Sequence, residues 1–325
     1  MPSSIEEKDI KNKRDKYLVG IYNTYIAQDN AVESDLDELV NDSGNAFSRS
    51  ATFSDIKDKR RLEADLVIAF TAFTNRFYDT MLRYNEQVAD KMSRYEIFKS
   101  KDKFIDLVEQ NQFVTQAKSM PSKIVDEFAT RIRYEDHRTT KHRLKTLKVG
   151  YTKTVRNIID NGIADGKNAV DISRDIEFFI KPELKGKRVS PYKYYRERHG
   201  VAKVPKDIFG GSVEYNSLRI ARTEIATSRR ETTVRSYSGL KSVRGFQWIL
   251  SSSHPRPDVC DFFANHDEGL GRGVWKSPPA SAHPNCFCNV KRVMINQKVT
   301  AKIKNLDKIK LTPFEIDKLK RGNKL

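Results

Sequence analysis

The chain has no long apolar run and little cysteine, and both shortages exclude classes of protein. A membrane-spanning helix needs about 18 or more apolar residues in succession, whereas the best run, 66–73, is short and is interrupted by Thr71. Three cysteines are few and odd in number, which argues against a disulfide framework. We therefore expect neither a membrane span nor a disulfide scaffold.

A secretory signal, a fixed-period repeat and a low-complexity block are also missing. The opening residues, MPSSIEEKDIKNK, are charged and have no apolar core behind them. We therefore expect synthesis in a cytoplasm, and no repeat architecture.

Negative charge is in short supply as well. The 325 residues include 60 Lys and Arg against 43 Asp and Glu, which gives a formal charge of +17. Such a surplus attracts a polyanion, and nucleic acid is the first candidate. The alternative is a basic protein that binds nothing specific, because charge alone discriminates poorly.

Apolar periodicity predicts long helices near the N-terminus. Ser4 and Glu7 have the spacing of a capping box, for a helix that runs to about Ala27. A helix of about forty residues is expected to begin at Ser54, as its N-cap, with an apolar pattern that extends to Tyr95. Its apolar stripe consists of Leu62, Leu66, Phe70, Phe73, Phe77, Met81, Tyr84, Val88, Met92 and Tyr95. Such a helix needs partner helices, from this chain or from another molecule.

Shorter helices are expected to follow. The pattern predicts helices at 102–118 and 121–134, and a helical hairpin made of 152–160 and 169–180. In the hairpin's turn, NGIADGKN, Gly166 suits a helix C-terminus, and the final asparagine can cap the next helix.

A basic segment at 181–206 separates this helical region, 1–180, from the rest. It holds nine Lys or Arg against two Glu, and three Pro and two Gly prevent a continuous helix. Its cations could hold phosphates while the tyrosines between them stack on bases. The candidate nucleic-acid contacts are Lys185, Lys187, Arg188, Lys193, Arg196 and Arg198. The alternative is a solvated linker whose tyrosines pack on a neighbouring domain.

A small α+β domain is expected over 207–295, so the predicted fold class is α+β and predominantly α-helical. A helix starts at Val213 and stops by Gly239, and strands are predicted at 244–250 and 288–295. After the domain comes a basic tail, 296–325, in which TPFE at 312–315 opens a short helix.

Two short clusters of cysteine, histidine and aspartate lie between the predicted strands. They consist of His254, Asp258 and Cys260 and of His283, Cys286 and Cys288. Zinc takes four tetrahedral N, S or O ligands, usually from two such clusters. The preferred set is Cys260, His283 and Cys286, with the fourth ligand from His254, Asp258 or Cys288. Cys288 can join only if the chain bends, because about 6.5 Å separates alternate residues of a strand.

Two other interpretations of these clusters remain open. The thiols could be small buried hydrophobes, with the histidines as loop donors. Alternatively, a zinc-dependent hydrolase or nuclease could use Asp258 or Glu268 to handle water on a zinc held by His254, Cys260 and His283. Neither the H-E-x-x-H motif nor the deaminase signature is present. This favours a closed structural site that joins the two strands, and GLGRG at 269–273 is interpreted as a turn.

The order of these segments resembles the C-terminal domain of the phage Mu F-like head-morphogenesis (minor capsid) family. The segments are RIARTEIATSRRE, FQWILSSSHPRPDVCDFF, a Gly-rich turn and SPPASAHPNCFCNV, over about 205–295. The matching residues are Arg222, Thr223, Glu224, Trp248, Asp258, Cys260, His283, Pro284, Cys286 and Cys288. Two positions depart from the family: Phe263 stands for the second cysteine of a frequent C-x-x-C, and Phe287 for a basic residue.

The resemblance implies a minor head protein of a tailed bacteriophage that is not an enzyme. Such a protein is made in the host cytoplasm, lies inside the virion head near the portal, and acts in head assembly and genome packaging or delivery. Its expected partners are the portal, capsid or scaffold proteins, and double-stranded DNA bound without sequence preference. A third possibility, a nucleic-acid-binding regulator, predicts sequence-specific binding instead.

Overall fold

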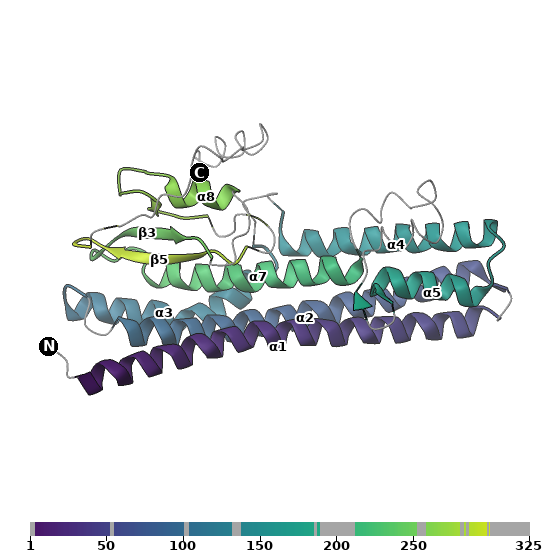
Figure 1. Cartoon of the computed structure of the whole chain (residues 1–325), viewed down its shortest axis with the longest axis horizontal. Coiled ribbons are helices and arrows are strands. Elements are labelled where there is room, and N and C mark those ends of the chain that lie inside the picture. The colour runs from purple at the N-terminus through teal and green to yellow at the C-terminus, as the bar shows by residue number, and fades with distance from the viewer. Residues whose placement is uncertain are drawn as a thin grey trace. The chain divides into compact units, whose positions relative to one another are not determined.

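The computed structural model confirms the predicted fold class, α+β and predominantly helical (Figure 1). It describes residues 4–52, 55–100, 104–131, 138–184, 187–188, 212–251, 258–279, 283, 286–297 and 299. Across these residues, no helix combines the length and the apolar character that crossing a bilayer requires.

The described helices and strands have the following bounds. The helices are α1 (Ser4–Ser50), α2 (Lys59–Lys99), α3 (Leu107–Glu127), α4 (Thr140–Ala164), α5 (Ala169–Ile180), α7 (Val213–Ser236) and α8 (Val259–Asn265). The strands are β1 (Glu183–Leu184), β2 (Lys187–Arg188), β3 (Val243–Ile249), β4 (Val274–Trp275) and β5 (Asn289–Met294). The short helix predicted at 312–315 lies outside the described residues.

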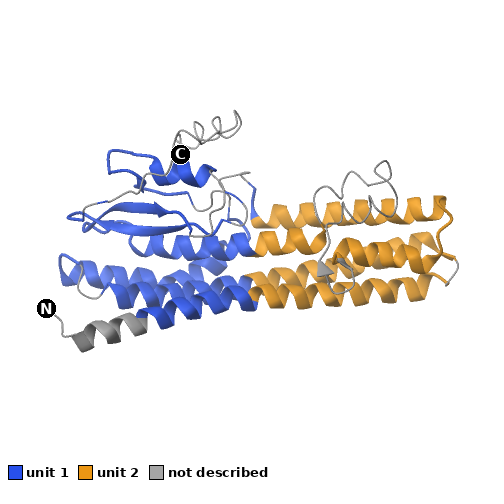
Figure 2. Cartoon of the chain, viewed as in Figure 1, with its two compact units in different colours: residues 1–27, 82–139, 222–325 blue, residues 28–81, 140–221 orange. Residues whose placement is uncertain are grey.

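The chain folds into two compact units, and neither is a single stretch of sequence (Figure 2). Unit 1 comprises residues 1–27, 82–139 and 222–325, and unit 2 comprises 28–81 and 140–221. Helices α1, α2 and α7 supply residues to both units.

The apolar stripe predicted on α2 is confirmed. Nine of its ten residues are buried, and Tyr84 is partly buried. The predicted N-cap, Ser54, lies outside the described residues. The helix begins at Lys59, after Asp58, whose Oδ1 accepts a hydrogen bond from the backbone N–H of Arg61 at 2.9 Å. Asp58 therefore caps the helix.

Helix α1 is longer than predicted, since it continues past Ala27 to Ser50. The prediction was wrong because polar and acidic residues interrupt the apolar pattern after Ala27. Buried residues nevertheless recur at helical spacing along this part of the helix. They include Val32, Leu36, Leu39, Ala46 and Phe47.

Helix α3 is continuous where two helices, 102–118 and 121–134, were predicted. Pro121 lies inside it, and Asp106 caps it by accepting from the N–H of Glu109 at 2.7 Å. A proline inside a helix costs about 3 kcal/mol. One buried stripe runs past the proline and offsets this cost. The stripe includes Phe113, Ala117, Met120 and Ile124.

The predicted hairpin is confirmed as α4 and α5 of unit 2. Gly166 has a φ of +67° in the turn, and the side chain of Asn168 accepts from the N–H of Asp171 at 2.8 Å. Helix α5 has the predicted bounds, whereas α4 begins well before residue 152. Its added turns bury Arg143 and Tyr151.

Aromatic rings form the centre of unit 2. Phe70 of α2 stacks on Tyr151 of α4 with 3.9 Å between ring centroids, and Phe73 stacks on Phe77 at 5.6 Å. Tyr151 also packs against Phe179 of α5 at 6.2 Å. All five side chains are buried, so α2, α4 and α5 share one apolar core.

Unit 1 contains a three-stranded antiparallel sheet in the order β4-β3-β5. The strands β3 and β5 are the two that the sequence predicts, and Trp248 pairs with Val290 between them. The strand β4 and the helix α8 were not predicted. Helices α8 and α7 lie on opposite faces of the sheet (Figure 1).

The glycine-rich segment is a turn, as predicted. Gly269, Gly271 and Gly273 have φ values of +83°, +105° and +72°. A Cβ at Gly273 would lie 2.5 Å from the carbonyl oxygen of Ala264 in α8. Glycine at this position therefore allows α8 to approach the start of β4.

Candidate metal centre

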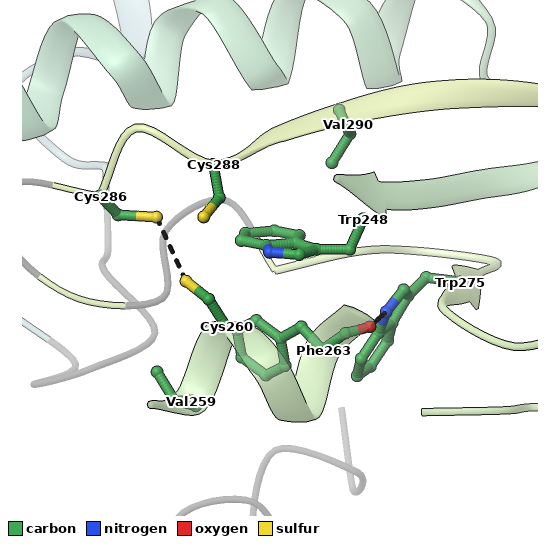
Figure 3. Packing of buried hydrophobic residues seen from close by; sticks show 8 residues of the cluster. All are labelled: Trp248, Val259, Cys260, Phe263, Trp275, Cys286, Cys288 and Val290. Atoms are coloured by element: carbon green, nitrogen blue, oxygen red, sulfur yellow. Dashed lines mark hydrogen bonds between the residues drawn. The ribbon is translucent and has the colours of Figure 1, made fainter. Parts of the chain in front are cut away.

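The three cysteines converge in the core of unit 1. Cys260 lies on α8, whereas Cys286 and Cys288 lie on the segment that leads into β5 (Figure 3). Their side chains are 0%, 1% and 3% exposed, and all three are free thiols. The Sγ atoms of Cys260 and Cys286 are 3.4 Å apart.

A ring nitrogen of His283 lies close to the sulfurs of Cys260 and Cys286. Among the described residues, the ligand atoms of Cys260, His283 and Cys286 all lie within 4.8 Å of one another. These are the three residues that the sequence analysis preferred as ligands.

Asp258 supports this group from both ends of its carboxylate. Its Oδ1 accepts a hydrogen bond from the N–H of Cys260 at 2.7 Å. In turn, Oδ2 of Asp261 accepts from the N–H of Asp258 at 2.8 Å, which completes a capping box on α8. Its Oδ2 lies 3.1 Å from Nε2 of His283. A carboxylate beside a histidine is the usual way to orient a metal-binding imidazole.

Arg230 of α7 fixes the segment that carries the other two cysteines. Its Nη1 donates to the carbonyl oxygens of Cys286 at 3.1 Å and of Cys288 at 2.7 Å. The same nitrogen lies 3.9 Å from the sulfur of Cys286. Arg230 is 1% exposed, so its charge acts on the sulfurs without much screening by water.

The surroundings favour a thiolate at Cys286. The pKa of this thiol is lowered because its sulfur accepts hydrogen bonds from the thiols of Cys260 and Cys288. Burial opposes the shift, while His283 and the charge of Arg230 act in the same direction as the thiols. A deprotonated sulfur is the form that binds a metal ion.

The donor set fits a zinc ion. With Zn–S bonds of about 2.3 Å, a tetrahedral site places two sulfurs about 3.8 Å apart, close to the 3.4 Å between Cys260 and Cys286. Sulfur and imidazole nitrogen are the ligands of structural zinc sites. Cys260, His283 and Cys286 would hold the ion.

Aromatic residues close the space around the sulfurs. Trp248 of β3 lies beside them and packs edge-on against Phe263 of α8, with 5.1 Å between ring centroids (Figure 3). Phe263 also packs edge-on against Trp275 of β4 at 5.3 Å. The ring of Phe263 is fully buried and fills the core beside the sulfurs.

The remaining sequence-predicted residues are placed as follows. Cys288 lies beside the group and accepts from the N–H of Ser251 at 3.4 Å. His254, Lys185, Lys193, Arg196 and Arg198 lie outside the described residues. Lys187 and Arg188 form β2, of which only the backbone is described.

The acidic residues near the turn make local bonds. Oδ1 of Asp267 accepts from the N–H groups of Gly269 and Gly271 at 2.8 and 3.0 Å, and Glu268 accepts from the N–H of Lys276 at 3.0 Å. These bonds hold the turn before β4. A groove of about 910 Å³ runs beside this turn, between it and the end of α7.

The Arg-Thr-Glu segment of α7 serves packing. Glu224 is fully buried, and its Oε2 lies 3.5 Å from Nη1 of Arg131. Nη1 of Arg131 also donates to the hydroxyl of Ser228 at 2.9 Å. This pair anchors the chain after α3 to α7.

Sequence reasoning missed Arg230, although a signal for it was present. Arg230 follows Ala226 and precedes Val234 by four residues each, so it lies on the apolar face of α7. An arginine on a buried face needs acceptors, and these are the carbonyl groups next to the metal-ligand candidates. Comparison of the chain with protein-family models, with curated proteins and with solved structures returns no match.

Proposed function

We propose that the chain is a minor head protein of a tailed bacteriophage that associates with the portal inside the virion head. It acts in head assembly and in genome packaging or delivery. The observation that carries this proposal is that the residues shared with the Mu F-like family belong to one packed unit. Glu224, Trp248 and the described cysteine, histidine and aspartate residues of the two clusters all lie in unit 1.

The metal centre has a structural role in this proposal and holds zinc. Burial of the sulfurs of Cys260 and Cys286 supports a closed site, because a catalytic zinc keeps a position open for water or substrate. The ion joins α8 to the segment that enters β5.

Contact with the packaged genome is the second part of the proposal, and the charge of +17 supports it. Binding to double-stranded DNA should weaken steeply with salt and be indifferent to sequence. Replacing Lys193, Arg196 and Arg198 together by Gln should reduce the slope of log affinity against log salt by about one per charge removed. A matched control replaces the exposed Lys141, Lys145 and Lys153 of α4 by Gln, and its slope should stay near that of the wild type.

The decisive experiment is recovery of the chain from phage particles. Quantitative mass spectrometry of purified procapsids and DNA-filled heads should detect it, and it should co-sediment with portal protein. Absence from both kinds of particle would refute the proposal. Sequence-specific DNA binding would instead support a regulator.

A further inference from the structure

We propose that Cys288 is the fourth ligand of the metal centre, and that Arg230 is the positioning residue that brings it there. The resulting site has three thiolates and one imidazole, from Cys260, His283, Cys286 and Cys288. The inference rests on the structural metal proposed above and is independent of the phage assignment.

The chain is bent between Cys286 and Cys288. In an extended strand, alternate carbonyl oxygens are about 6.5 Å apart. Here one nitrogen of Arg230 lies 3.1 Å from the first oxygen and 2.7 Å from the second, so the oxygens are closer than in a strand. The chain therefore bends at the place where a bend lets both sulfurs reach one ion.

The sulfur of Cys288 is directed toward the other two sulfurs. The sulfurs of Cys260 and Cys286 are 3.4 Å apart, and the buried side chain of Cys288 lies beside them. Figure 3 shows the three side chains pointing toward one another from α8 and from the segment before β5. Three sulfurs around one point are three corners of a tetrahedral site.

The competing fourth ligand is Asp258. One of its oxygens caps α8 through the N–H of Cys260, and the other lies 3.1 Å from His283. Each oxygen of Asp258 therefore already has a partner. Cys288 would keep its bond from the N–H of Ser251, since a thiolate sulfur accepts such bonds while it binds a metal.

The buried charge of Arg230 suits a site with three thiolates. Zn²⁺ with three thiolates and a neutral imidazole carries one net negative charge, and an isolated buried charge is costly. Arg230 is buried, and its guanidinium lies 3.9 Å from the sulfur of Cys286. Its positive charge offsets the negative charge of the site.

Cobalt substitution of the full-length chain tests the ligand set. In the Co²⁺ protein, the intensity of the thiolate-to-metal charge-transfer band rises with the number of thiolates. Cys288→Ser should therefore lower this intensity to about two-thirds, since two of three thiolates remain. Asp258→Asn should weaken the affinity for Co²⁺, because Asp258 orients His283, while the band at saturating Co²⁺ should keep the intensity of three thiolates. Full intensity in Cys288→Ser would overturn the assignment.

Arg230→Met tests the positioning role, with Arg230→Lys as the conservative variant. Arg230→Met should give the spectrum of Cys288→Ser, because the bend relaxes, and Lys should restore part of the band. A wild-type spectrum in Arg230→Met would refute the role of Arg230. If Arg230→Met does not fold, Cys288→Ser still decides the ligand set. Failure of the wild type to bind Co²⁺ would overturn the metal centre, and would leave the portal and DNA tests of function untouched.

Discussion

The two units of the chain are stabilised in different ways. The core of unit 2 is a stack of apolar and aromatic side chains, and several of its ion pairs, such as Arg49 with Asp65, lie at the surface. Unit 2 buries a few charged groups, Arg143, Asp175 and Glu214, whereas unit 1 buries a larger set of charged and sulfur-bearing groups. These include Glu96, Arg131, Glu224, Arg230, Arg292 and the three cysteines.

The difference indicates that unit 1 contains the candidate binding site. Burial of apolar area alone stabilises a helical unit. A buried charge costs several kcal/mol unless it is paired well. The buried polar groups of unit 1 hold the sheet, α7 and the metal-ligand candidates in fixed positions, which a binding site requires.

Glu96→Ala should have the largest effect on stability and should break unit 1. Oε2 of Glu96 accepts from Arg292 at 3.1 Å and from the hydroxyl of Tyr237 at 2.8 Å. Removing the carboxylate leaves a buried cation uncompensated, at a cost of about 3–5 kcal/mol. In unit 2, Arg49→Ala removes a surface pair and should cost under about 1 kcal/mol. Urea unfolding measures both, and equal costs would contradict the comparison.

A methyl group at Gly162 should destabilise unit 2 through packing alone. A Cβ there would lie 2.5 Å from Cγ1 of the buried Ile172, and overpacking costs about 1–3 kcal/mol. Gly150 on the same helix has no atom within 4 Å of such a Cβ, so Gly150→Ala should stabilise by about 0.4–1 kcal/mol. Thermal unfolding of both variants checks the opposite signs. Two shifts of the same sign would contradict the described packing.

Removing one helix cap in each unit sharpens the comparison further. Asn168→Ala in unit 2 and Asp258→Ala in unit 1 should each cost about 1 kcal/mol of stability. Only Asp258→Ala should also weaken zinc affinity, by about 10–100-fold, because Asp258 orients His283. Competition with a chelator measures the affinity. Unchanged zinc affinity in Asp258→Ala would show that the carboxylate of Asp258 does not orient His283.

Alkaline pH should act on both units weakly and through different groups. Burial raises the pKa of Tyr151 in unit 2 and of Tyr237 in unit 1, and the charge of Glu96 raises that of Tyr237 further. The unfolded chain releases these protons near pH 10 while the folded chain keeps them, so stability falls as pH rises above about 10. Ultraviolet titration of Glu96→Gln should show a lower pKa for Tyr237 alone. A change in the pKa of Tyr151 in this variant would contradict the prediction that Glu96 acts on Tyr237 alone.

The periodicity of apolar residues predicted those helices and strands whose formation depends on burying apolar side chains. The stripe of α2, the bounds of α5 and the strands β3 and β5 follow from it. It failed where polar residues hid a buried stripe, after Ala27, and where tertiary packing tolerates Pro121 inside α3. In the site, the spacing of Cys260, His283 and Cys286 identified a group that the fold brings together. Arg230 was not identified, because its partners are backbone carbonyls distant in sequence.

The zinc content of the purified full-length chain is the most direct test of the metal centre. Elemental analysis should find one zinc per chain in the wild type. The variants Cys260→Ala and His283→Ala should lose it, while Gly150→Ala, which lies in unit 2, should keep it. A folded wild type that contains no zinc and takes up none when it is supplied would contradict the account.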